Sequence, residues 1–117
     1  MMVAAADRRF RVFYRDYVNQ VAVSSAQPEP LAEARIVPLA ERLLVDRDNF
    51  IGIVDGADTI LQCYLNDDAE SVTLELVYPE ASGCLRLRLP RAQAMALLEN
   101  LPASFDDKLL HGAQYID

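Results

Sequence analysis

Four short runs of strand-forming residues follow one another between residues 49 and 89, and each of the first three is followed by a turn rich in Asp, Asn, Gly or Pro. The runs cover 49–54, 59–65, 71–78 and 84–89, and the turns cover 55–58, 66–70 and 79–83. This spacing is typical of an antiparallel meander, in which each strand pairs with the next along the chain. The segment therefore predicts a four-stranded antiparallel β-meander.

Apolar and polar residues alternate in the third and fourth runs, so each should have one face in the core. The inward residues are Val72, Leu74, Leu76, Tyr78, Leu85, Leu87 and Leu89, and the outward ones are Thr73, Glu75, Arg86 and Arg88. Keeping the inward faces together places Glu75 opposite Arg86 or Arg88, as a cross-strand ion pair.

The first run, 49–54, is apolar on both faces, which predicts a central strand covered on both sides. Pairing it with the second run predicts two mixed faces. One carries Ile51, Ile53, Ile60, Gln62 and Tyr64, and the other carries Phe50, Val54, Leu61, Cys63 and Leu65. Which face is exposed stays open at this point.

Helices are predicted on both sides of the meander. In 8–22 the apolar residues recur at the spacing of one helix face, although their aromatic and β-branched types favour a strand at 9–14 as the alternative. A short extended piece at 34–37 precedes a helix that begins at Pro38. A helix at 91–101 and a short last helix ending near Leu110 complete the chain. We expect one α+β domain, 1–117, with the helices from both ends packed on the sheet.

The chain carries a net charge of −7, and its surplus of acids lies in one segment. Residues 48–83 contain eight Asp or Glu and no Lys or Arg. Proteins that bind nucleic acid or an anionic membrane need a basic surface, so the net negative charge argues against both functions. It favours a basic protein partner.

The acidic turns are the candidate partner-binding surface, because a field of one sign steers a charged partner. The alternative is that turns are simply rich in acids. The candidate residues are Asp55, Asp58, Tyr64, Asp67, Asp68 and Glu70.

Residues for catalysis, metals or cofactors are scarce. The chain has two cysteines and one histidine, too few for a structural zinc site, and it lacks a glycine-rich phosphate loop. Cys63 and Cys84 are expected to be free thiols, because two alternate strands of a meander lie beyond disulfide reach. We therefore expect no enzyme, cofactor or metal. With no apolar run long enough to span a bilayer and no secretion signal at residues 1–7, we expect a cytoplasmic location, in a bacterium.

The stretch 35–101 resembles immunity proteins of bacterial polymorphic toxin systems, in particular the group paired with deaminase-type toxins. The resemblance is carried by the order of elements: 35–45 with Pro38, then 49–55, 59–62, 74–78 and the helix at 91–101. The tryptophan expected just after the proline is absent. The resemblance implies a protein that binds and neutralises a cognate basic toxin.

Two other functions fit the same sequence. A small acidic secretion chaperone is one, and a homodimer would favour it. A small enzyme that uses surface carboxylates or His111 is the other, and a formed pocket holding His111 beside a buried acid would favour that.

Overall fold

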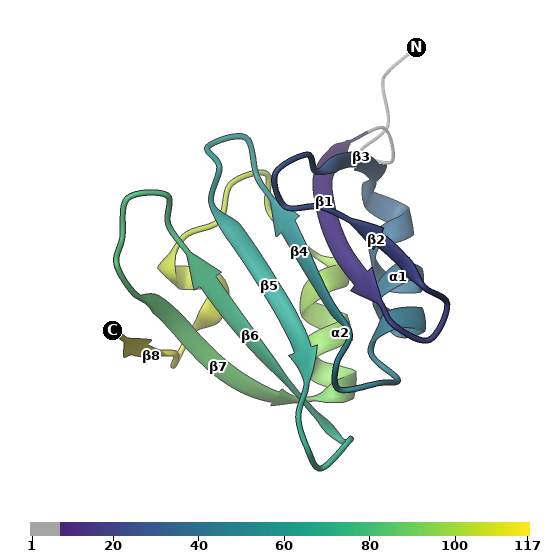
Figure 1. The fold of residues 1–117 in the computed structure, drawn as a ribbon. Coiled ribbons are helices and arrows are strands. Elements are labelled where there is room, and N and C mark those ends of the chain that lie inside the picture. The colour runs from purple at the N-terminus through teal and green to yellow at the C-terminus, as the bar shows by residue number, and fades with distance from the viewer. Residues whose placement is uncertain (1–7) are drawn as a thin grey trace.

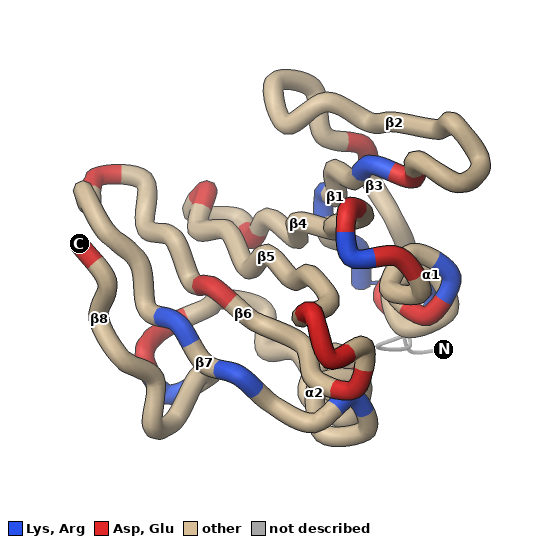
Figure 2. Tube along the Cα trace, turned by 60° about the horizontal axis from the view of Figure 1, so that its bottom comes forward, with Lys and Arg blue, Asp and Glu red and all other residues tan. Residues whose placement is uncertain are grey.

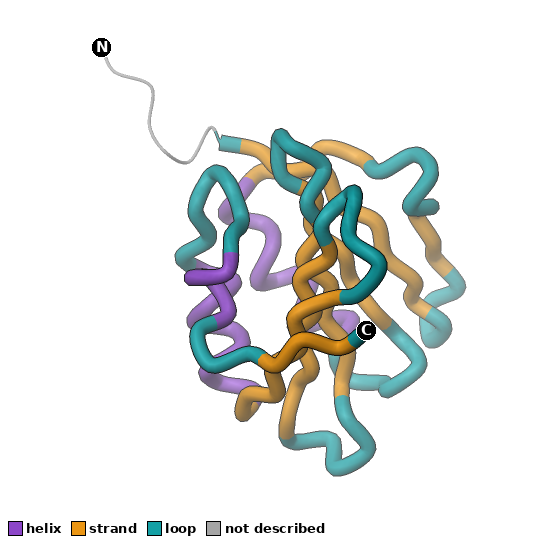
Figure 3. Tube along the Cα trace, turned by 90° about the vertical axis from the view of Figure 1, so that its left-hand side faces the viewer, coloured by secondary structure: helices purple, strands orange, loops and turns teal. Residues whose placement is uncertain are grey.

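One eight-stranded antiparallel sheet forms a layer of the protein, and two short α-helices pack against one of its faces (Figures 1 and 3). The computed structural model describes residues 8–117, so the expectation about a secretion signal at 1–7 lies outside this range. The elements are β1 (Arg9–Asp16), β2 (Val21–Val23), β3 (Glu29–Ala32), a 3-10 turn η2 (Glu33–Arg35), α1 (Ile36–Leu43), β4 (Phe50–Val54), β5 (Ile60–Leu65), β6 (Ser71–Val77), β7 (Cys84–Pro90), α2 (Arg91–Glu99), a 3-10 turn η3 (Asp107–Leu110) and β8 (Gln114–Ile116).

The predicted meander is present as β4–β5–β6–β7, and the α+β class is confirmed. The prediction of only four strands is wrong. The sheet runs in the order β2-β1-β4-β5-β6-β7-β8, and β3 also pairs with β1. The extra strands extend the meander on both sides, three from the N-terminal part of the chain and β8 from its end.

The predicted helix at 8–22 is wrong, and the alternative of a strand at its start is correct. β1 alternates with period two, with Phe10, Val12 and Tyr14 towards the helices and the arginines at 9, 11 and 15 on the other side. The aromatic and β-branched residues fit a pleated strand, and pairing of β1 with β4 on one edge and with β2 and β3 on the other satisfies its backbone.

The pairing predicted between the first two meander strands is wrong by one residue. Ile51 lies opposite Cys63 and Ile53 opposite Leu61, so these four share the face that the helices cover. The connecting turn has five residues rather than four, because the Asp55 amide donates to the Thr59 carbonyl. One extra residue in a turn moves every side chain of the next strand to the opposite face.

The core lies between the sheet and the two helices. The predicted extended piece at 34–37 is wrong, since α1 already begins at Ile36 and places Pro38 in its first turn, where a missing N–H is harmless. The predicted last helix is a 3-10 turn, η3, whose preceding residue Asp106 accepts a hydrogen bond from the Lys108 amide. The helix residues in the core are Ile36, Ala40, Leu43, Ala94 and Leu98.

Both cysteines are free, as expected, because β6 separates their strands β5 and β7. Cys63 lies in the core, where burial raises the pKa of its thiol to about 12. Cys84 is partly exposed. Burial also raises the pKa of the Cys84 thiol, so the difference between the two thiols lies in exposure. We expect a disulfide reagent at pH 8 to modify Cys84 in the native protein and Cys63 only after unfolding. Titration with and without denaturant measures this, and finding no free thiol in denaturant would contradict it.

Candidate protein-binding face

One face of the sheet carries no helix in residues 8–117, and we call it the uncovered face (Figure 3). The strand pairings place its side chains in rows across β1, β4, β5, β6 and β7. The face combines apolar and aromatic residues with a polar group around Glu75. Its members are Phe13, Phe50, Val54, Ile60, Gln62, Tyr64, Thr73, Glu75, Val77 and Arg86. Four of the apolar ones, Phe50, Ile60, Tyr64 and Val77, are partly exposed.

Phe13 fills the middle of this face by lying over Gly52 of the neighbouring strand. The ring occupies the space that a side chain at position 52 would need, which explains the glycine in an otherwise bulky strand. Phe50 meets the Phe13 ring edge-on, with 6.4 Å between ring centroids. The two rings therefore pack on each other on a face that no helix covers.

Glu75 is the polar centre of the uncovered face and is 6% exposed. Its carboxylate accepts hydrogen bonds from Gln62 Nε2 at 2.8 Å, Tyr64 Oη at 3.2 Å and Arg86 Nε at 2.7 Å. The expected cross-strand ion pair is thus formed with Arg86. Glu75 and Thr73 lie on the face away from the helices, as expected, but both are buried there by their neighbours on the sheet. Burial and the nearby Glu75 carboxylate raise the pKa of Tyr64, so this phenol stays protonated as a hydrogen-bond donor.

Asp55 is buried, so the prediction that it forms part of an exposed binding surface is wrong. It is 2% exposed, and its carboxylate accepts hydrogen bonds from three backbone amides: Ala57 and Thr59 in its own turn, and Phe105 after α2. A turn aspartate often caps its own turn. The bond to the distant Phe105, across 50 residues, makes this one a structural link between the sheet and the C-terminal segment.

The two acidic turns lie at opposite ends of β5 and do not form one surface (Figure 2). A six-residue strand separates them by roughly 20 Å. Asp58, in the β4–β5 turn, is exposed and pairs with Arg11 at 2.7 Å. Asp67, Asp68 and Glu70 lie exposed in the β5–β6 turn.

The β5–β6 turn meets a second acid-rich loop at one end of the sheet. The loop between α1 and β4 brings Asp46 and Asp48 there, and Arg47 from the same loop contacts Asp67 at 3.3 Å. Hydrogen bonds from the Glu70 and Ser71 amides and the Ser71 hydroxyl lower the pKa of Asp68, which keeps it ionised. We call Asp46, Asp48, Asp67, Asp68 and Glu70 the acidic end.

A shallow depression of about 300 Å³ joins the acidic end to the uncovered face. Sequence reasoning proposed Tyr64 as a partner contact, and the structure places its partly exposed ring in this depression. Phe50 was not proposed from the sequence, because the incorrect register placed Phe50 and Tyr64 on opposite faces of the sheet. In the structure the two lie opposite each other on the same face. The lining residues are Arg47, Asp48, Asn49, Phe50, Gln62 and Tyr64.

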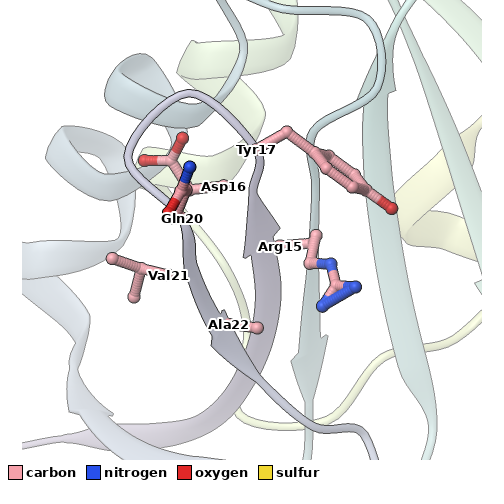
Figure 4. Close-up of a pocket in the computed structure, with 6 residues that line it drawn as sticks. All are labelled: Arg15, Asp16, Tyr17, Gln20, Val21 and Ala22. Carbon is pink, nitrogen blue, oxygen red and sulfur yellow. The ribbon is translucent and has the colours of Figure 1, made fainter.

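The hairpin between β1 and β2 borders the uncovered face on its other side. Arg15 and Tyr17 point to the side of β4 and β5, whereas Val21 points to the side of α1 (Figure 4). The Arg15 guanidinium stacks on the Tyr17 ring at 5.0 Å from its centroid. Arginines thus line the face along β1, and Arg86 and Arg88 line it along β7.

Residues 8–117 contain one histidine and no cluster of metal-ligating side chains. His111 is exposed beyond η3. In this range no three His, Cys, Asp or Glu side chains stand close enough together to bind a metal ion. The helices in residues 8–117 are also not long and apolar enough to cross a membrane.

No family model, curated protein or solved structure matches this chain. The resemblance of 35–101 to immunity proteins therefore rests on its order of elements alone.

Proposed function

We propose that the protein is a non-catalytic binding domain whose partner is a basic protein, and that it contacts the partner through the acidic end and the adjoining part of the uncovered face. The observation that carries this proposal is the position of Phe50 and Tyr64, two partly exposed aromatic rings in a depression that Asp48 of the acidic end also lines. Aromatic residues surrounded by polar groups are the usual energetic centre of a protein interface.

The side chains around the two rings are already held in place, which supports this surface as the binding site. Glu75 holds Gln62 and Tyr64 by hydrogen bonds, so little side-chain freedom remains to be lost when a partner binds. The carboxylates at the acidic end attract a basic partner over a distance and speed the encounter. Arg15 on β1 and Arg88 on β7 favour acids at the corresponding margins of the partner, which restricts the choice of partner.

An immunity protein is the form of this function that the sequence resemblance supports. A toxin that acts on nucleic acid needs a basic surface for the phosphates of its substrate. The acidic end presents carboxylates in place of phosphates, and the aromatic rings add apolar contact. Binding there blocks the toxin without any chemistry by the inhibitor.

Charge reversal at the acidic end tests the proposal. We expect Asp67→Lys with Glu70→Lys to slow association with the partner by about tenfold or more at low salt, because electrostatic steering accelerates association by orders of magnitude. Both residues are exposed, so folding should change little. The matched control is Asp58→Lys with Glu80→Lys, which changes the net charge equally but away from the acidic end.

The partner is first captured from the native host on the immobilised wild-type protein, and association is then followed by stopped-flow. Tyr64→Ala should mainly speed dissociation, whereas Tyr64→Phe keeps the ring and should retain most of the affinity. If the control pair slows association as much as the acidic-end pair, the effect reflects net charge and this surface is ruled out. A partner that binds Tyr64→Ala as tightly as wild type would also exclude it.

A further inference from the structure

The longest uncharged run of the described chain lies on its surface. Residues 17–28 contain no Asp, Glu, Lys, Arg or His over 12 positions, in a chain of which 25% is charged. None of them is buried, and Tyr17, Val18 and Val21 are 53%, 61% and 41% exposed. We call this segment the uncharged arm, and it comprises the β1–β2 turn, β2 and the loop that leads to β3.

The start of the arm is held firmly in place. The buried Asp16 carboxylate accepts hydrogen bonds from the Val18 and Asn19 amides, both at 3.1 Å, and the Tyr17 amide donates to Asn49 Oδ1 at 2.8 Å. Exposed valines on an ordered segment cost free energy in water. An ordered apolar segment is well suited to binding, because its conformation is already fixed.

β2 within the arm is a three-residue edge strand that has neither a charge nor a proline. It is the first strand in the sheet order, and nothing in residues 8–117 pairs with its outer edge. Edge strands are normally protected from strand addition by being very short or by charges or proline. β3, which shares the same edge of β1, has both, in Glu29 and Pro30. Val21–Val23 has neither.

We infer that β2 pairs antiparallel with β2 of a second copy and joins two sheets into one. A chain of charge −7 repels its own copies, so self-association favours a contact without carboxylates. The uncharged arm provides such a contact, whereas β8 at the opposite edge is followed by Asp117. The pairing is self-complementary: a two-fold axis near Ala22 places Val21 opposite Val23 of the other copy.

This dimer does not depend on the proposed function, because it uses a sheet edge rather than the uncovered face. Two antiparallel strands related by a two-fold axis perpendicular to the sheet keep the same faces on the same side. Both uncovered faces thus remain accessible and point in one direction, which allows the dimer to hold two partner molecules.

Sedimentation of the isolated protein over a range of concentrations tests the inference. The wild-type mass should rise from 13.1 kDa towards twice that value, and salt should favour the dimer by screening the repulsion between two acidic chains. Ala22→Lys should raise the dimer dissociation constant by about tenfold, or about 1.4 kcal/mol, because like charges then meet across the two-fold axis.

The matched control is Tyr115→Lys on β8, which changes the net charge by the same amount at the opposite edge and should leave the dimer intact. Circular dichroism checks that each variant folds, and Val21→Lys replaces Ala22→Lys should the latter unfold. A wild-type protein that stays monomeric, or a dimer that Tyr115→Lys weakens and Ala22→Lys does not, overturns the inference. A dimer would favour the chaperone form of the binding function over the immunity form, whereas neither result bears on whether a basic partner binds at the acidic end.

Discussion

Replacing Leu74 by alanine is expected to lower the free energy of unfolding by about 2–5 kcal/mol, as large-to-small changes in well-packed cores do. Leu74 is fully buried in the middle of β6. It lies between Cys63 on one neighbouring strand and Leu87 on the other. Strands on both sides fix its surroundings, so the core has little freedom to collapse into the space that the lost side chain leaves.

Urea denaturation followed by circular dichroism measures this effect. Val45→Ala is the control, because it also shortens an aliphatic side chain, at a position that is 65% exposed. Equal losses for the two variants would contradict the core described here. Thr73→Ala is not a suitable control, since Thr73 is buried and its hydroxyl donates to Asn66 Oδ1 at 2.6 Å.

Asp55→Ala is expected to destabilise the protein by about 2–4 kcal/mol. The substitution leaves three backbone amides without their acceptor, and those of Thr59 and Phe105 are in buried hydrogen bonds. Each buried donor left unsatisfied costs about 1–3 kcal/mol. Loss of the Phe105 bond also releases the segment after α2 from the sheet.

Asp58→Asn is the control in the same turn, because it removes the charge that pairs with Arg11 while asparagine tolerates the positive φ of 66° at this position. We expect it to cost at most about 1 kcal/mol, as an exposed ion pair does. Similar urea midpoints for the two variants would mean that the Asp55 carboxylate is not a structural link. The same reasoning excludes Asp55 from any charge-reversal test of binding, because a lysine there would unfold the protein rather than alter an encounter surface.

Local patterns were sufficient to predict the central part of the fold. The alternating runs of β6 and β7 predicted the correct strands and faces, because each strand has one face in the core and a short turn to its neighbour. They also predicted that Glu75 pairs with Arg86 or Arg88, and the structure shows Arg86. The error at the β4–β5 turn came from a single residue. Strand periodicity carries no information about the length of a turn. The length of this turn is set by hydrogen bonds between Asp55 and Thr59, one of them to the Asp55 carboxylate, which the periodicity does not predict.

β1 shows why one pattern can support two structures. Its apolar residues match the spacing of a helix face, and its arginines at 9, 11 and 15 match a strand. Whether this segment forms a helix or a strand depends on β4, far along the chain, because one edge of β4 is available to pair with it. The same limit applies to the candidate site: the two acidic turns are close in sequence, but a strand between them places them at opposite ends of the sheet.

The position of β1 inside the sheet also has a consequence for folding kinetics. β4 to β7 pair with their neighbours in sequence, so their contacts close short loops. β1 and β4 are separated along the chain by β2, β3 and α1, so the residues that pair are far apart in sequence. Arg11, for example, pairs with Val54. Closing the longer loop costs more entropy before any contact offsets it. The meander should therefore form first, and docking of β1 should be the slow step that completes the native state.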